Sequence, residues 1–213
     1  MGKLTSCLPA LALGVAAAVS GTSSASAGPI SYIETTTASG TLGGNSFGGT
    51  VTLEMLNVDT MNIMNPTSNN PSIPGPATVT VVESGGTTVT ATFTHPIEVF
   101  SNLPPNVTTP LVGFRDTNFS PSLPTLDILD DISSSFAMYR LASPIGPISD
   151  MAGPSPGEPF PTDKGNFILT AGSVGATASF TAITQTTAPE PSSLAVLAAA
   201  LAGLGLARRR RRS

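Results

Sequence analysis

The chain has little of the chemistry that most catalytic and metal sites need. Among its 213 residues there are one cysteine, one histidine and no tryptophan, and charged residues make up only 10%. Zinc fingers, iron–sulfur clusters and thiol catalysis need clustered Cys or His, so these classes are excluded and no cofactor is expected. Between residues 28 and 187, twelve acidic side chains stand against three basic ones, a net charge of −9. Nucleic-acid binding is excluded as well, because it needs clustered lysine and arginine.

What the chain does have, at its N-terminus, is the pattern of a secretory signal. A lysine is followed by an apolar stretch over residues 8–19 and by small residues, with Ala25 and Ala27 at the −3 and −1 positions. The stretch is shorter than the roughly 20 residues of a stable membrane span. We therefore expect signal peptidase to remove residues 1–27. Cys7 precedes the apolar stretch, so lipidation is not expected, and the mature chain then holds no cysteine.

The last 26 residues, 188–213, combine three features in a fixed order. The motif Pro189, Glu190, Pro191 comes first, and an apolar run over residues 194–207 follows it. The chain then ends on a basic cluster of five residues, Arg208, Arg209, Arg210, Arg211 and Arg212. Fourteen helical residues reach about 21 Å, which is short of the ~30 Å hydrocarbon core, but snorkelling arginines and local thinning make up the difference. Five arginines resist translocation, so we expect them to stay cytoplasmic while the body lies outside.

This order of features resembles the PEP-CTERM sorting signal of Gram-negative bacteria, a tail also catalogued as an ice-binding protein C-terminal domain. The resemblance implies processing near Pro189–Pro191 by an exosortase, an integral-membrane enzyme. A plain C-terminal anchor is the alternative. Within the body, Ala38–Gly44 and Ser143–Ser149 resemble segments common among PEP-CTERM exported proteins, and that resemblance implies no activity.

The body, residues 28–187, is predicted to be an all-β domain of the antiparallel sandwich type. Thr, Val, Ile and Phe alternate in short runs that Gly, Pro, Asn or Ser clusters interrupt, and no Pro- and Gly-free stretch of a dozen residues carries a helical apolar stripe. The predicted strands are Ser31–Thr37, Thr50–Asp59, Ala77–Glu83, Thr87–His95, Ile97–Ser101, Ser134–Leu141, Phe167–Thr170 and Ala176–Thr184. One short helix is expected over Leu126–Ser133, with Asp130 and Asp131 on its outward side.

One hairpin allows a prediction of register, because residues opposite each other in an antiparallel pair face the same way. A two-residue loop at the glycine pair 85–86 would place apolar Val81 opposite a threonine. A three-residue loop over residues 85–87 instead pairs Val81 with Ala91 and Val79 with Phe93, and such a loop with a left-handed glycine is a known type.

Two patterns of catalytic residues have a structural explanation that we prefer. Residues 44–48 match the Gly-x-Ser-x-Gly nucleophile elbow around Ser46, and Asp59 and His95 follow in hydrolase order. The elbow needs a strand before it and a helix after it, whereas here two β-patterned runs flank the glycines, which favours a hairpin turn. His95 is the only imidazole for a general base, but it precedes a proline at a strand end, where a polar residue is ordinary.

Acidic and hydroxyl residues suggest two kinds of binding. Asp127, Asp130, Asp131 and Asp150 cluster in sequence, but nothing fixes a pair across a cleft for glycosidase chemistry. A calcium site is the other possibility, because hard oxygen donors of the kind calcium takes are offered by Asp116, Asp127, Asp130 and Asp131, although no EF-hand or nonapeptide repeat is present. Threonines at every second position, 78–80 and 88–94, are typical of the solvent face of a sheet; similar ladders occur on ice-binding surfaces.

The sequence therefore predicts a non-enzymatic exported protein with no catalytic or metal residues. Its partners are signal peptidase and an exosortase, the membrane before processing, and exopolysaccharide in a biofilm setting. It is expected to be anchored transiently in the inner membrane and then placed on the cell surface or outside the cell. A secreted carbohydrate- or calcium-binding β-module is the alternative, and a secreted hydrolase using Ser46 and His95 is a third hypothesis.

Overall fold

The computed structural model describes residues 28–118, 126–153, 155–172 and 174–184, and this part of the chain is all-β, as predicted. Its strands are β1 (Ile30–Leu42), β2 (Asn45–Val58), β3 (Ser72–Gly75), β4 (Thr78–Val82), β5 (Thr88–Thr92), β6 (Ile97–Asn102), β7 (Leu111–Asp116), β8 (Leu126–Ile132), β9 (Ile145–Ala152), β10 (Phe160–Thr162), β11 (Gly165–Leu169) and β12 (Thr177–Thr184). Two single 3-10 turns, η1 (Thr60–Asn62) and η2 (Ser134–Phe136), accompany them.

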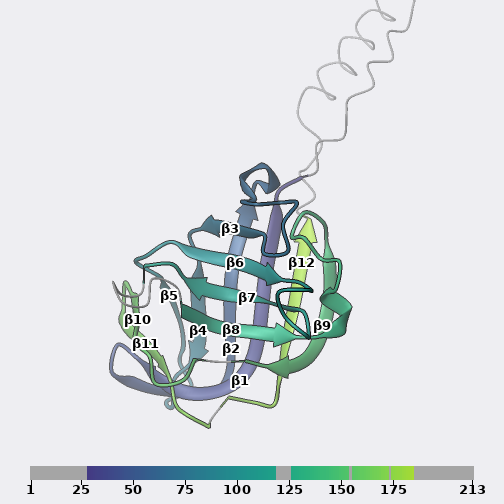
Figure 1. Ribbon diagram of the computed structural model, residues 1–213. Coiled ribbons are helices and arrows are strands. Elements are labelled where there is room, and N and C mark those ends of the chain that lie inside the picture. Colours follow the sequence, from purple (N-terminus) through teal and green to yellow (C-terminus); the bar gives the residue numbers. More distant parts are fainter. Residues whose placement is uncertain (1–27, 119–125, 154, 173, 185–213) are drawn as a thin grey trace, which may run out of the picture.

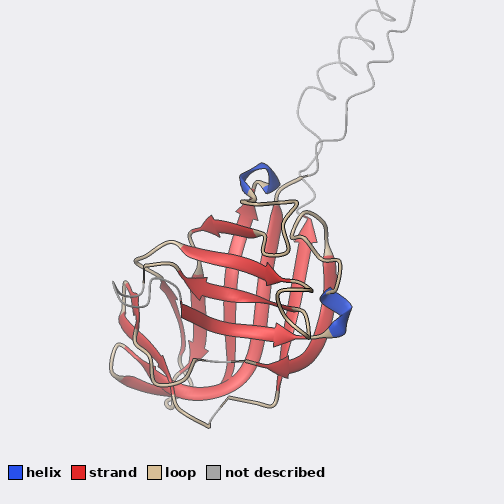
Figure 2. Ribbon diagram, viewed as in Figure 1, coloured by secondary structure: helices blue, strands red, loops and turns tan. Residues whose placement is uncertain are grey.

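All these strands belong to one antiparallel sheet that curls over on itself (Figures 1 and 2). The order is β3-β6-β7-β8-β9-β12-β1-β2-β4-β5, and the β10–β11 hairpin adds to the end of β1. In Figure 1, β6, β7 and β8 run across the front of β12, β1 and β2. The predicted antiparallel sandwich of two separate sheets is therefore replaced by one curled sheet with two layers. Strand β9 pairs with both β8 and β12, so it joins the two layers by hydrogen bonds.

The core lies between the two layers and is rich in phenylalanine. Along β1 the even-numbered residues point inward and are buried, because successive side chains of a strand face opposite sides. The Phe136 ring meets the Phe180 ring edge-on, with centroids 5.9 Å apart, and the Phe47 ring stacks on the Phe167 ring at 5.7 Å. The buried Tyr32 hydroxyl donates to the carbonyl of Leu141 at 2.7 Å, which satisfies the one polar atom of that ring.

The helix predicted over Leu126–Ser133 is wrong, because these residues form strand β8 and the start of the turn after it. Strand β8 pairs with β7 on one side and β9 on the other, and a register shift at Phe114/Arg115 leaves both Ile128 and Leu129 buried. A strand that is covered on both faces does not alternate, so its apolar spacing resembles that of a helix. The strand predicted over Ser134–Leu141 is also wrong, since η2 and turns occupy it.

The β4–β5 hairpin confirms the predicted loop length and corrects its position. Val79 lies opposite Ala91 and Val81 opposite Val89, and the Glu83 N–H donates to the Thr87 carbonyl. The loop is therefore residues 84–86 and not 85–87, with Gly86 at φ +82. Both registers keep the apolar side chains on one face, so the hydrophobic pattern by itself does not choose between them.

Candidate functional site

The outer face of six neighbouring strands carries a straight line of hydroxyl side chains. Each member lies directly opposite the next in the pairing of β9, β12, β1, β2, β4 and β5. We call this line the hydroxyl row; its members are Ser149, Ser179, Thr35, Thr52, Thr80 and Thr90. With strands about 4.8 Å apart, the row extends over about 24 Å. The sequence showed threonines at every second position along single strands, but only the pairing of strands shows that they align across the sheet.

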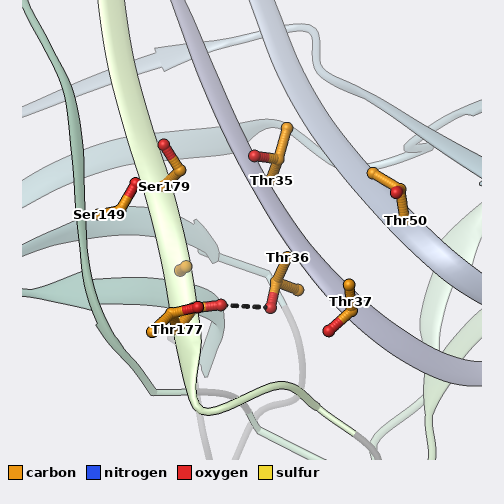
Figure 3. Close-up of a pocket in the computed structure, with 8 residues that line it drawn as sticks. Thr35, Thr36, Thr37, Thr50, Ser149, Thr177 and Ser179 are labelled. Carbon is orange, nitrogen blue, oxygen red and sulfur yellow. Dashed lines mark hydrogen bonds between the residues drawn. The ribbon is translucent and has the colours of Figure 1, made fainter.

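Next to β12 and β1 the hydroxyl row widens into a shallow groove (Figure 3). The groove is lined by seven hydroxyl residues and one alanine: Thr35, Thr36, Thr37, Thr50, Ser149, Thr177, Ala178 and Ser179. The Thr36 hydroxyl donates to the Thr177 carbonyl at 2.9 Å, which ties the two strands together at the groove. Farther along the row, the Thr80 and Thr90 hydroxyl oxygens are 2.8 Å apart. The lining offers many donors and acceptors and carries neither charge nor aromatic rings.

A second feature is a set of carboxyl groups inside the fold, the acidic cluster: Glu34 on β1 and Asp127, Asp130 and Asp131 on β8. Glu34 and Asp131 are fully buried and Asp130 is 6% exposed. The two carboxylate oxygens of Glu34 have no hydrogen-bond partner, and neither have Oδ1 of Asp130 and Oδ1 of Asp131. Asp131 Oδ2 accepts from the Phe180 N–H at 3.3 Å. The prediction that Asp130 and Asp131 point outward is therefore wrong.

Burial and mutual repulsion make these carboxyl groups weak acids. Burial, and then the charges of Asp130, Asp131 and Asp127, raise the pKa of Glu34 well above its usual 4.5. Burial raises the pKa of Asp130 and that of Asp131 to about 7, and neighbouring carboxylates add to both shifts. Burial also raises the pKa of Asp127, and the positive charge of Arg115 offsets part of that rise. Glu34, Asp130 and Asp131 therefore keep their protons to a higher pH than ordinary carboxyl groups do.

Sequence reasoning missed Glu34, although a signal was present. The inward positions of strand β1 alternate along the chain and include Ile30, Tyr32 and Thr36. Glu34 occupies the inward position between Tyr32 and Thr36. A single charged residue on the apolar face of a strand is the pattern of a buried carboxyl group. What the sequence cannot show is that β8, nearly a hundred residues later, brings three more carboxyl groups toward it.

The four aspartates suggested for calcium do not gather as donors to one ion. Asp116 is fully buried at the end of β7, where it accepts from the Asn118 N–H at 2.8 Å and lies 3.4 Å from His95 Nδ1. The other three, Asp127, Asp130 and Asp131, lie on β8. Asp150, which was considered only for glycosidase chemistry, is exposed on β9 and accepts from the Met151 N–H. Within the ranges that the structure describes, no three acidic, histidine or cysteine side chains form a group that could hold a metal ion.

The residues of the elbow pattern have separate structural roles. Ser46 follows a two-residue Gly43–Gly44 turn that joins β1 to β2, and no helix follows. Asp59 caps η1 by accepting from the Met61 N–H at 2.9 Å. His95 lies beside Asp116 at the rim of a shallow apolar hollow that Phe93 and three prolines line. The preferred hairpin is confirmed, with its turn at Gly43–Gly44 and residues 45–48 in strand β2.

The sorting residues of the two chain ends, Ala25 and Ala27, Pro189–Pro191 and Arg208–Arg212, lie outside the described residues. The family model of the PEP-CTERM protein-sorting motif matches residues 187–212. The tail is a PEP-CTERM sorting signal. A PEP-CTERM tail marks an exported protein that an exosortase processes, so this chain is exported across a membrane. No curated protein and no solved structure matches the chain at a significant level.

The described residues hold only short 3-10 turns as helices, and none of these is long and apolar enough to cross a membrane.

Proposed function

We propose that this chain is a non-enzymatic surface or extracellular-matrix protein that reaches its place through the PEP-CTERM tail and works in an exopolysaccharide or biofilm setting. The observation that carries the proposal is the match of residues 187–212 to the sorting motif, directly after an all-β body. Signal peptidase removes residues 1–27. The tail then holds the body at the inner membrane, with Arg208–Arg212 in the cytoplasm, until an exosortase cuts near Pro189–Pro191.

The proposal is tested by the fate of tail variants in the native cell. Glu190→Ala, or deletion of residues 208–212, leaves a folded body that stays unprocessed or is found in the wrong compartment. Glu158→Ala, a change of the same kind in the body, is processed normally. The measurement is mass spectrometry of cell fractions, which also reports whether the mature chain starts at Gly28. Normal processing and placement of both tail variants would overturn the proposal.

The hydroxyl row supports a more specific activity, in which the body binds a neutral polysaccharide. A polymer rich in hydroxyl groups needs many donors and acceptors in a regular array, and the row supplies six across six strands. The uncharged lining of the groove suits an uncharged ligand better than an acidic one, since the body as a whole carries a net charge of −9.

Binding to the exopolysaccharide of the producing cell tests this activity. The double variant Thr35→Val/Thr52→Val removes two hydroxyls from the row and keeps the shape and β propensity of the side chains. We expect a several-fold loss of retention on the immobilised polymer. Thr67→Val, at an exposed threonine of the loop after η1, is the matched control. Equal retention of all three proteins would exclude the row as a binding surface.

A calcium-binding module is the remaining alternative. The unpartnered carboxylate oxygens of the acidic cluster favour it, whereas the described residues hold no three acidic side chains arranged to bind one ion, which counts against it. A divalent cation would relieve the repulsion among these groups as protons do. Calcium added to the purified protein at pH 7.5 would then raise its melting temperature, and Glu34→Gln would remove that rise. An unchanged melting temperature would exclude this alternative.

A further inference from the structure

Both ends of the described chain leave the body at the same end of the sheet. Ile30, the first residue of β1, pairs with Thr184, the last residue of β12, and also with Val58, the last residue of β2. Turn η1 follows β2 directly and contacts β3. In Figure 1 the start of β1, the tips of β2 and β12, and η1 lie together at the top of the molecule. The signal sequence and the sorting tail are therefore attached to one end, which we call the exit end.

The exit end also holds most of the exposed large apolar side chains. Six such side chains stand out among the described residues, and four of them are at this end: Leu56, Met61, Met64 and Ile183. We call these four the exit-end patch. Met61 lies on η1 and is 87% exposed, which leaves almost its whole side chain in water. Ile183 lies opposite Ser31 near the end of β12, and Met64 forms a β-bridge with Ser72 at the start of β3. Gathered apolar exposure of this kind marks an interaction surface.

We propose that the exit-end patch rests on the surface of the phospholipid bilayer while the tail holds the chain in the membrane. This inference depends on the proposed function, in which the apolar run that starts at Leu194 enters the bilayer. Nine residues separate Thr184 from Leu194. Fully extended, the chain from Thr184 to Leu194 spans at most about 36 Å, so the exit end stays near the lipid surface. Such a short tether keeps the patch at a high effective concentration near the bilayer, and weak apolar contacts are then enough to hold it there.

The charges near the patch are nearly balanced, which favours contact through apolar side chains over attraction to anionic headgroups. Asp59 caps η1, and the Arg140 guanidinium donates to the Ser68 carbonyl in the loop that follows η1. Methionine suits such a surface because its flexible side chain adapts to a soft partner. A second copy of the chain and the processing enzyme are the other possible occupants, and the experiment below separates them from lipid.

The experiment places one fluorescent label at either end of the body. The chain without its signal sequence, residues 28–213, has no cysteine of its own and is reconstituted in vesicles of phosphatidylethanolamine and phosphatidylglycerol. A label at Met61→Cys reports on the exit end, and a label at Asn45→Cys reports on the β1–β2 hairpin at the opposite end of β2. With a nitroxide quencher on the lipid headgroups, we expect several-fold stronger quenching at position 61 than at position 45. The difference should persist in high salt, because the contact is apolar.

Two further variants connect the quenching to the patch itself. Ile183→Asp in the Met61→Cys chain should remove most of the quenching, whereas Met151→Asp, at an exposed methionine on β9, should leave it unchanged. Equal quenching at positions 61 and 45, in chains that still float with the vesicles, would overturn the inference. So would a disulfide-linked dimer of the unlabelled Met61→Cys chain under oxidising conditions, because a second copy would then cover the patch. Chains that do not float at all would instead contradict the membrane step of the proposed function.

Discussion

Glu34 shows how one buried side chain sets a property of the whole fold. Its carboxyl group is fully buried on β1, has no hydrogen-bond partner, and faces the charges of Asp127, Asp130 and Asp131. An unpaired charge in such a place costs several kcal/mol, so the folded state keeps these groups protonated. The stability of the body is therefore linked to pH through a few residues and not through its net charge.

Stability should fall as the pH rises from about 5 to 8. In this window the unfolded chain has already lost the protons of these carboxyl groups, whereas the folded chain keeps them up to a pKa of about 7 for Asp130 and Asp131. The folded state then binds more protons, and each such group removes up to about 1.4 kcal/mol per pH unit. Glu34→Gln should flatten this slope and be more stable than the natural chain at pH 8. Urea unfolding at pH 5 and pH 8 measures both, with Glu54→Gln on the outer face as the control. A slope that Glu34→Gln leaves unchanged would contradict the assignment.

The ion pair between Arg115 and Glu98 shows the opposite case, a buried charge that is well paired. Arg115 Nε and Nη2 donate to Glu98 Oε2 at 2.9 and 2.7 Å, and the guanidinium lies 4.8 Å from the centre of the Phe100 ring. Arg115→Met should destabilise the body by about 3–5 kcal/mol, because it leaves the Glu98 carboxylate buried without a partner. Adding Glu98→Leu should recover most of that loss. Equilibrium unfolding of the two single variants and the double variant forms the test, and a double variant as unstable as Arg115→Met would refute it.

At the scale of the elements, alternation of apolar residues was enough to predict most strands. The runs at β1, β2, β4, β5, β6, β11 and β12 were found from it, with ends that differ by a few residues. Strands β3, β9 and β10 were not predicted, because a proline interrupts the pattern of each. Strand β7 was not predicted either, because most of its residues are buried and do not alternate. Pairing with neighbours that are distant in sequence keeps these segments extended, as β12 does for β9.

The β4–β5 loop gives a prediction about a single backbone conformation. Gly86 has φ +82, while Gly85 has no such positive φ, and an added methyl group would meet open space at both positions. Gly86→Ala should therefore destabilise the body by about 1 kcal/mol through backbone strain alone. Gly85→Ala should be neutral or slightly stabilising, since it only reduces the freedom of the unfolded chain. Thermal unfolding of the two variants measures this difference, and equal effects would show that the loop is not the one described.

At the scale of the whole molecule, the body and the sorting tail are expected to be independent. A fragment of residues 28–187 should unfold in one cooperative transition, show the circular dichroism of a β protein, and melt within about 2 °C of the full chain in detergent. The reason is that the described residues close a core of their own, with the last strand ending at Thr184. Burying the tail in that core would bring five arginines with it at several kcal/mol for each unpaired charge. A fragment without a cooperative transition would contradict this independence.

The sequence by itself determined that the chain is exported, carries a sorting tail and has an antiparallel β body. These properties depend on residues that are contiguous in the sequence. Sorting enzymes recognise short segments of chain, and a strand is predicted from the alternation of apolar and polar residues within one short run. Only the tertiary structure decided that β8 is a strand, that Glu34 meets the carboxyl groups of β8, and that six hydroxyls align across six strands. Each of these depends on pairing between segments far apart in sequence. Register fixes which side chains become neighbours, and no local pattern contains it.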